Sequence, residues 1–197
     1  MVDADEILTL FRRSGALLDG HFRLSSGLHS SGYLQCALVL QDPDRAAMLG
    51  RLIAERVRSL DAAVVLSPAL GGIVIGHEVA RALGARAIFA ERQDGVLTLR
   101  RGFTIGSGER VLVVEDVVTT GGSTRETIQV ARKAGAEVVG AASIIGRSGG
   151  AAALDVPLHS LVLMRLQNYD PKDCPLCAAG VSITKPGSRS EPPSREP

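Results

Sequence analysis

The sequence predicts an α/β fold with a mostly parallel central sheet flanked by helices. From residue 62 onward, short β-branched, apolar runs alternate with amphipathic segments, which is typical of parallel strands buried on both faces. The chain has 197 residues, of which 45% are hydrophobic and 22% are charged, so it can bury a core of its own. This composition excludes a disordered, collagen-like or disulfide-scaffold protein.

The first 60 residues predict two helices with short strands between them. Apolar residues recur at helical spacing over residues 3–18, where Asp3 is a candidate N-cap. Residues 20–36 are rich in glycine and serine and predict small strands and turns that form a cap. Pro43 suits the first turn of a second helix. The apolar stripe of that helix comprises Met48, Leu49, Leu52, Ile53, Val57 and Leu60.

The remaining elements alternate along the chain. We expect strands at residues 62–66, 85–90, 110–115, 137–145 and 158–166, and helices at residues 72–83 and 123–134. The polar stretch between residues 92 and 108 indicates a functional loop with a hairpin around Gly95. Residues 1–184 are expected to form one domain, and residues 185–197 a disordered tail.

The charge balance argues against nucleic-acid or membrane partners. Lys and Arg number 22, Asp and Glu number 21, and aromatic residues make up 3% with no Trp. No apolar run approaches the roughly 18 residues of a membrane helix, and the acidic N-terminus does not resemble a signal peptide. We therefore expect a cytoplasmic protein whose anion site is local.

Three cysteines fit reduced thiols better than a disulfide framework. Cys174 and Cys177 form a CxxC motif, but a structural zinc site needs four ligands and the chain has no second such pair. A second copy of the chain could supply two more ligands. The sequence favours the interpretation that Cys174 and Cys177 are two semi-buried thiols in a C-terminal turn. A redox role for them has less support than either of these interpretations.

The most informative stretch is residues 111–124, VLVVEDVVTTGGST, a buried strand that runs into two acids and a Gly/Thr loop. Amides of residues 119–123 can converge on one phosphate at the start of the next helix. Glu115 and Asp116 would repel that phosphate, so sugar hydroxyls or Mg²⁺ are their expected partners. Together these groups predict a ribose 5-phosphate pocket. Other nucleotide-binding sites are less well supported, because the chain has no GxxxxGK[ST] and no strand followed by GxGxxG. The alternative interpretation of this stretch is a strand with a polar turn that only caps the next helix.

This stretch resembles the phosphoribosyl-diphosphate motif of the type I phosphoribosyltransferases. Residues 22–33 resemble the N-terminal hood of the orotate phosphoribosyltransferases, and residues 67–73 resemble their pyrophosphate loop. The resemblance covers roughly residues 5–150. It implies a type I phosphoribosyltransferase fold with a small hood, mainly residues 18–40. It also implies transfer of ribose 5-phosphate from 5-phosphoribosyl 1-diphosphate to orotate, with Mg²⁺, in pyrimidine (UMP) biosynthesis.

The resemblance also assigns roles to residues. It implies catalytic roles for Glu115, Asp116, Arg100 and Arg101. Orotate would meet Thr119 and Arg147, whose planar guanidinium suits a carboxylate; spacing alone would make Arg147 a surface residue. Phosphoribosyl diphosphate would bind Ala69, Leu70, Gly71, Gly72, Arg92, Glu115, Asp116, Val117, Val118, Thr119, Thr120, Gly121, Gly122 and Ser123.

The chain departs from the family where lysines are usual. It has Gly71 in the pyrophosphate loop, Ser25 in the hood, and arginines in the mobile segment. Arg92, Arg100 and Arg101 could replace the missing charge or form a solvated basic hairpin. His29 is expected near phosphate, and His21, His77 and His159 are expected to be structural.

The family works as homodimers with shared active sites, so we expect a dimer. Two other functions remain open. One is transfer to another nucleobase, against which the hood sequence and Arg147 argue. The other is a nucleic-acid-binding regulator that kept the fold.

Overall fold

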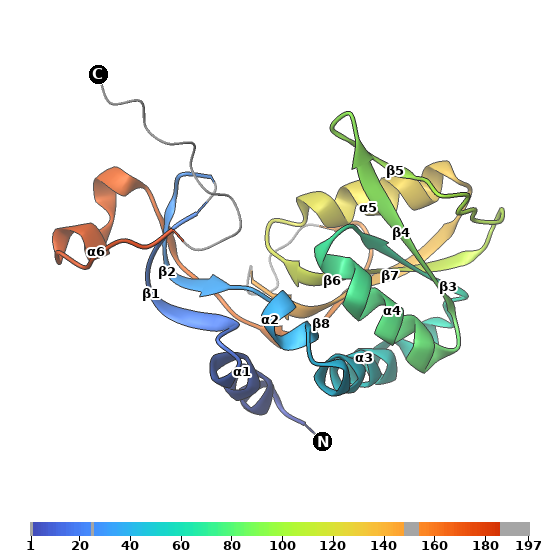
Figure 1. The fold of residues 1–197 in the computed structure, drawn as a ribbon. Helices are drawn as coiled ribbons and strands as arrows, with labels where there is room; N and C mark the ends of the chain where they lie inside the picture. Colours follow the sequence, from blue (N-terminus) through green and yellow to red (C-terminus); the bar gives the residue numbers. More distant parts are fainter. Residues whose placement is uncertain (1, 25, 148–153, 186–197) are drawn as a thin grey trace. The chain divides into compact units, whose positions relative to one another are not determined.

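The computed structural model describes residues 2–24, 26–147 and 154–185, which fall into two compact units (Figure 1). The first unit comprises Met1–Ala16 and Gln35–Arg165, and the second comprises Leu17–Leu34 and Leu166–Pro197. Within these described ranges, no helix is both long and apolar enough to cross a membrane.

The first unit is built on a six-stranded sheet with the order β5-β4-β3-β6-β7-β8. Five strands are parallel, and β5 alone runs antiparallel, as the partner of β4 in a hairpin. The predicted α/β class and mostly parallel sheet are therefore confirmed. The strands are β3 (Val64–Pro68), β4 (Arg86–Gln93), β5 (Val96–Leu99), β6 (Arg110–Val118), β7 (Glu137–Gly146) and β8 (Leu158–Leu163).

Helices cover both faces of this sheet. Figure 1 shows α3 and α4 on one face and α5 on the other. The crossover from β3 through α4 leads to β4, whereas the crossover from β6 through α5 leads to β7, so the winding reverses between β3 and β6. The helices are α1 (Ala4–Arg13), α2 (Ala37–Leu40), α3 (Pro43–Val57), α4 (Gly71–Leu83) and α5 (Gly122–Lys133), with a short 3-10 turn η1 (Arg58–Leu60).

The central strands are apolar because neither face meets water. Val111, Leu112, Val113 and Val114 of β6 are all fully buried, which explains a continuous apolar run without alternation. Strand β6 is longer than predicted and continues to Val118. The two acids of the motif therefore lie within the strand and not in the loop that follows it.

Local side-chain chemistry sets the helix starts. Asp3 forms a capping box with Glu6 at the start of α1, as its position predicts. Asp42 caps α3 through the amides of residues 44 and 45. The predicted helix 3–18 is wrong at its end, because α1 stops at Arg13 and the chain turns at Gly15, with φ of 65°, before entering β1.

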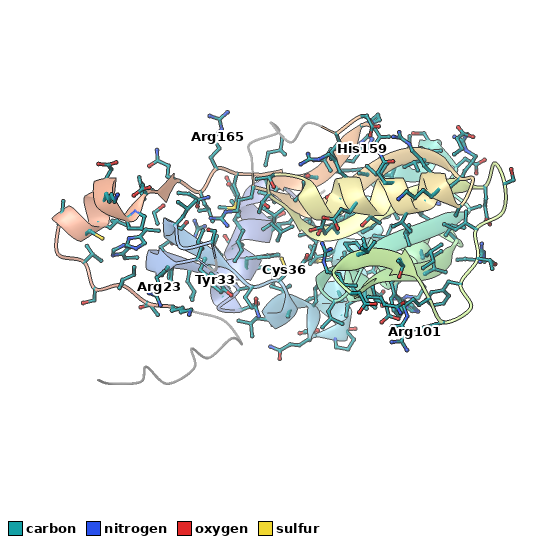
Figure 2. All side chains as sticks on the ribbon, turned by 90° about the horizontal axis from the view of Figure 1, so that it is seen from above. Arg23, Tyr33, Cys36, Arg101, His159 and Arg165 are labelled. Carbon is teal, nitrogen blue, oxygen red and sulfur yellow. The ribbon has the colours of Figure 1, made fainter. Side chains whose placement is uncertain are left out.

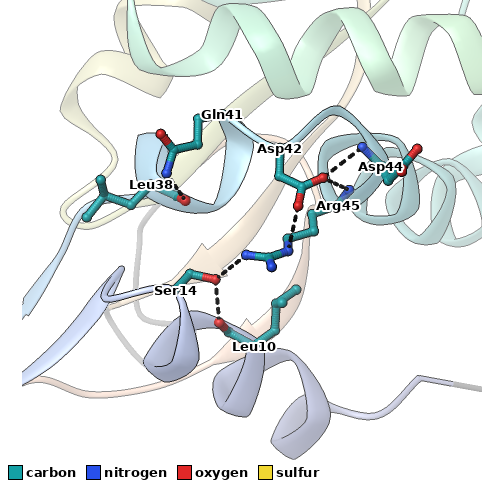
Figure 3. A network of polar contacts seen from close by, with 7 residues as sticks. All are labelled: Leu10, Ser14, Leu38, Gln41, Asp42, Asp44 and Arg45. Atoms are coloured by element: carbon teal, nitrogen blue, oxygen red, sulfur yellow. Dashed lines mark hydrogen bonds and ion pairs between the residues drawn. The ribbon is translucent and has the colours of Figure 1, made fainter.

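A polar network joins the ends of α1 and α3 (Figure 3). The guanidinium of Arg45 pairs with the carboxylate of Asp42 at 2.9 Å and donates to the hydroxyl of Ser14 at 2.8 Å. That hydroxyl in turn donates to the carbonyl of Leu10 at 2.8 Å. The side chains of Ile7 and Phe11, also on α1, are fully buried. The first helix is therefore fixed by both apolar and polar contacts.

The second unit is a small antiparallel sheet with the order β1-β2-β9. The predicted strand 158–166 is too long: β8 ends at Leu163, and the chain beyond Leu166 joins this second sheet. Of the predicted tail, only Lys185 lies within the described residues. The elements are β1 (Leu17–Arg23), β2 (His29–Leu34), β9 (Asn168–Tyr169), the 3-10 turn η2 (Pro171–Asp173) and α6 (Pro175–Ala178).

Candidate active site

The chemistry-bearing residues of the first unit gather where the winding of the sheet reverses. In open α/β sheets, ligands bind at the carboxyl ends of the strands at such a point. Here β3 and β6 end side by side, and each is followed by the N-terminus of a helix. A cavity of about 90 Å³ lies at this place. Its lining comprises Pro68, Ala69, Gly71, Gly72, Arg92, Leu97, Glu115, Asp116 and Ser123.

Glu115 is a partly buried acid held by the helix that follows it. The hydroxyl of Thr124 donates to Glu115 Oε2 at 2.6 Å. The pKa of Glu115 is raised to about 7, chiefly by burial and in part by the neighbouring charge of Asp116, while hydrogen bonds from the Thr124 and Ser123 hydroxyls oppose the rise. Further hydrogen-bond donors or a cation would therefore stabilise the ionised form of Glu115. The motif suggests the Thr124 hydroxyl as a further donor to the phosphate, whereas in the structure this hydroxyl donates to Glu115.

Asp116 is the second acid of the cavity. Its Oδ1 accepts a hydrogen bond from the amide of Val117 at 2.9 Å, and its side chain also hydrogen-bonds to the buried thiol of Cys36. Burial raises the pKa of Asp116, and burial together with Asp116 raises that of Cys36. A Cβ on Gly71 would lie 2.9 Å from Asp116 Oδ1, so the missing side chain at Gly71 leaves room for this carboxyl group.

The loop after β6 presents an anion site. Gly121, with φ of 78°, turns the chain into α5, and no described side chain caps the first turn of that helix. The free amides at a helix N-terminus, together with the helix dipole, favour a phosphate. Thr119 and Thr120 are exposed beside them, and the guanidinium of Arg125 holds the carbonyl of Thr120 at 3.0 Å.

Not every predicted residue of the motif faces the cavity. Val117 and Val118 belong to β6, where they pair with Ile145 and Gly146 of β7. Val118 is almost fully buried, so its side chain belongs to the core. Of the segment 117–123, Ser123 alone is in the lining of the cavity.

The predicted pyrophosphate loop lines the opposite side of the same cavity. Gly72 is buried against the end of β6, and a Cβ there would lie 3.0 Å from the carbonyl oxygen of Val114. Gly72 therefore allows the first turn of α4 to approach the strand. Ala69 and Gly71 line the cavity, whereas Leu70 projects into solvent with 84% of its surface exposed.

Arg92 brings positive charge to the cavity from β4. Its guanidinium donates to the carbonyl of Gly95 at 2.8 Å and pairs with Glu126 of α5 at 2.7 Å. Arg92 also lines a larger, open hollow of about 960 Å³ between β5 and α5. That hollow contains neither Glu115 nor Asp116 in its lining, so we place the acid chemistry in the smaller cavity.

Arg100 and Arg101 do not line the cavity in this chain. Both pair with Glu91, at 3.6 and 3.0 Å, and the guanidinium of Arg101 lies over the ring of Phe89. Their side chains are 47% and 60% exposed, and Figure 2 shows Arg101 projecting from the first unit. The contacts lower the pKa of Glu91, chiefly through the hydrogen bond from Arg101.

Thr119 and Arg147 lie together, beyond the ends of adjacent strands. Val118 is in register with Gly146, and the amide of Arg147 donates to the carbonyl of Val118 at 2.8 Å. Burial lowers the pKa of the Arg147 guanidinium. The structure thus brings together the two residues predicted to contact orotate, although neither lines the small cavity.

Comparison with known proteins agrees with this geometry. Residues 38–162 match the model of the phosphoribosyl transferase domain. The chain is 54% identical to orotate phosphoribosyltransferase of Pelotomaculum thermopropionicum over 94% of this chain and 97% of that protein. It is 50% identical to the orotate phosphoribosyltransferase of Carboxydothermus hydrogenoformans over 93% and 97%. The crystal structure of Mycobacterium tuberculosis orotate phosphoribosyltransferase with inorganic phosphate is similar, with a TM-score of 0.67, 28% identity and coverage of 82% and 96%.

Proposed function

Because the chain belongs to the phosphoribosyl transferase family, and within it to the orotate phosphoribosyltransferases, we propose the following reaction for its site. The chain transfers ribose 5-phosphate from 5-phosphoribosyl 1-diphosphate to orotate and releases orotidine 5′-phosphate and diphosphate, a step of pyrimidine synthesis. The observation that carries this assignment is the placement of two partly buried acids beside an uncapped helix N-terminus at one cavity.

The phosphoribosyl group spans that cavity. Its 5-phosphate accepts hydrogen bonds from the amides and hydroxyls of residues 119–123, at the positive end of α5. Its ribose hydroxyls donate to Glu115 and Asp116. Burial raises the pKa of both acids, and the donated hydrogen bonds stabilise their ionised forms. The diphosphate lies against residues 69–72, with Arg92 as the nearby cation.

The acids also suit Mg²⁺ held jointly with the substrate. Mg²⁺ prefers oxygen ligands and commonly binds through one or two carboxylates together with substrate phosphates. Glu115 and Asp116 are partly buried carboxylates at the cavity, and a cation there would offset the cost of ionising both. When bound, the ion neutralises charge that develops on the departing diphosphate.

Orotate recognition rests on Thr119 and Arg147. A guanidinium meets a carboxylate through two parallel hydrogen bonds, which orient a planar ring as well as attract it. Partial burial strengthens this attraction because it removes competing water from Arg147. A base without a carboxylate cannot form this pair of hydrogen bonds with Arg147, and this gives the specificity for orotate.

The chemical step needs positioning and charge stabilisation more than acid–base catalysis. The bond from ribose C1 to diphosphate breaks while the orotate nitrogen attacks the opposite face of the ring, so positive charge develops on the sugar. Glu115 and Asp116 hold the ribose in place and lie near that charge. Orotate provides an ionisable ring nitrogen, so the reaction requires no covalent nucleophile.

The active enzyme is a homodimer with shared active sites. Arg100 and Arg101 are exposed and lie outside the lining of their own chain's cavity, which suits residues that serve the site of a second subunit. There they would meet the diphosphate and exclude water. They directly follow β5, the second strand of the β4–β5 hairpin.

The first test is an assay of orotate consumption, followed by its ultraviolet absorbance, with phosphoribosyl diphosphate and Mg²⁺. Uracil, hypoxanthine and adenine serve as parallel substrates. Turnover of orotate alone supports the proposal. Turnover of another base would contradict the role of Arg147, and binding of phosphoribosyl diphosphate without any turnover would point to a regulator.

A further inference from the structure

A cluster of metal-binding side chains lies in the second unit, and the proposed reaction uses none of them. His21 of β1, His29 of β2, and Cys174 and Cys177 at the two ends of a short turn place one ligand atom each within 4.8 Å of all the others. The two histidines face each other across the β1–β2 hairpin, in which Arg23 lies opposite His29 in the strand register. The two cysteines come from a segment more than 140 residues later in the chain.

The separations are close to the edges of a tetrahedron around one ion. His21 Nε2 lies 2.9 Å from His29 Nδ1 and 3.5 Å from Cys174 Sγ. Cys177 Sγ lies 3.8 Å from His21 Nε2 and 3.3 Å from His29 Nδ1. With bonds of about 2.0 Å to nitrogen and 2.3 Å to sulfur, a tetrahedral zinc ion separates its ligand atoms by about 3.3 to 3.8 Å. Small side-chain movements would bring all four atoms onto one ion.

A further hydrogen bond orients one ligand for metal binding. The other ring nitrogen of His21, Nδ1, lies 2.8 Å from the carbonyl oxygen of Val181 and donates to it. The proton is then on Nδ1, and the lone pair of Nε2 points to the cluster. Metal-bound histidines almost always have such a backbone or carboxylate partner.

Burial and size also favour a bound ion. His21, His29 and Cys174 are buried, whereas the second unit has few apolar side chains to hold it together. Among its described residues, Leu17 and Phe22 are the buried apolar side chains other than Cys174. Small folds with so little core usually depend on a metal or a disulfide. An ion here would join the C-terminal turn to the hairpin.

We propose that His21, His29, Cys174 and Cys177 bind one structural zinc ion. Two thiolates and two imidazoles in a closed tetrahedral set are typical of structural zinc, whereas iron–sulfur clusters are held mainly by cysteines. All four protein ligands are present, so no position is left for substrate. The ion stabilises the second unit and takes no part in phosphoribosyl transfer.

Metal analysis of the purified full-length protein tests this proposal. We expect one zinc per chain in the wild type and its loss in Cys177→Ser and His29→Ala. Cys36→Ala and His77→Ala serve as matched controls, because Cys36 and His77 lie in the first unit, and they should keep the zinc. Absence of stoichiometric zinc from the wild type, or full retention in both ligand variants, would overturn the proposal.

Cobalt substitution gives a second measurement that does not depend on how the variants fold. Zinc is removed from the wild-type protein with a chelator, and Co²⁺ is added. The expected spectrum has intense visible bands of tetrahedral Co²⁺ and a near-ultraviolet thiolate band. Weak octahedral bands without thiolate absorption would contradict the site. Because both readouts are independent of orotate turnover, failure of the proposed reaction would leave them unaffected.

Discussion

The hydroxyl of Thr124, in the first turn of α5, donates to Glu115 at the end of β6 over 2.6 Å. The helix whose N-terminus is proposed to receive the substrate phosphate therefore also holds the acid proposed to receive the ribose. Phosphate and ribose recognition are linked through one turn of helix.

This link predicts a change in pH dependence for Thr124→Val. The hydroxyl stabilises the ionised carboxylate, so its loss raises the pKa of Glu115 above about 7. Because ribose binding requires the ionised form, the acidic limb of the kcat/KM profile for phosphoribosyl diphosphate should move about half a unit to one unit higher in pH. Thr127→Val is the control, because Thr127 is equally buried but donates to the carbonyl of Ser123. An unmoved acidic limb in Thr124→Val would contradict the role of Glu115.

Glu115 should also make the protein without substrate less stable as pH rises. In the folded state the pKa of Glu115 is raised from 4.5 to about 7, so the folded chain holds this proton more tightly than the unfolded chain. Stability is thus lost as pH increases from about 4.5 through 7. Glu115→Gln should raise the free energy of unfolding at pH 8 by on the order of 1–3 kcal/mol, with little gain at pH 4.5. Denaturant titrations at both pH values check this, with the exposed Glu55→Gln as control.

Gly72 should not tolerate a side chain. A Cβ would lie 3.0 Å from the carbonyl oxygen of Val114 and 3.1 Å from Pro68, both of which are fixed in the sheet. Gly72→Ala should displace the start of α4 and lower kcat/KM for phosphoribosyl diphosphate roughly ten- to hundredfold. Gly106→Ala, where the nearest contact would be an ordinary 3.6 Å, should be neutral. Equal steady-state kinetics for both variants would refute this account of the loop.

Removal of the Arg147 guanidinium should weaken the binding of orotate and leave the binding of phosphoribosyl diphosphate nearly unchanged. Arg147→Ala is expected to raise KM for orotate by roughly tenfold or more, because a charge-assisted pair of hydrogen bonds is lost. Binding of phosphoribosyl diphosphate, measured by calorimetry, should change little. Arg132→Ala provides a control, since Arg132 pairs with Asp155 on the surface. Equal losses for both substrates would remove Arg147 from base recognition.

A mixing experiment tests the shared active sites. Arg101→Ala and Asp116→Asn should each be nearly inactive as homodimers. After joint refolding, half of the dimers combine the two variants, and each of these has one site free of both changes. About a quarter of the wild-type activity should therefore return. No recovery, although mixed dimers are present by mass spectrometry, would place Arg101 in the site of its own subunit.

Much of the first unit could be predicted because its signals are local. The caps at Asp3 and Asp42, and the apolar runs of β3, β6 and β7, each lie within one element. The two acids lie near the end of one strand and the glycine loop follows it directly, so their grouping also follows from the chain order. Element ends were less predictable, since the continuation of β6 to Val118 depends on pairing with β7.

The second unit could not be predicted in the same way, because its contacts are distant in sequence. Nothing near Asn168 indicates that it pairs with Ser30, and nothing near Cys174 indicates that His21 lies beside it. The chain has no second cysteine pair, and the spacing of His21 and His29, the other two residues of the cluster, matches no common zinc motif. The detectable signal was two histidines in facing strands of one short hairpin.

The polar network of Ser14, Asp42 and Arg45 has a consequence for local unfolding (Figure 3). When α1 detaches, the guanidinium of Arg45 loses the hydroxyl of Ser14, and the buried ring of Phe11 meets water. Opening of α1 therefore disturbs the start of α3 as well. The two helices should exchange their amide hydrogens as one cooperative unit, although 29 residues separate Arg13 from Pro43 in the sequence.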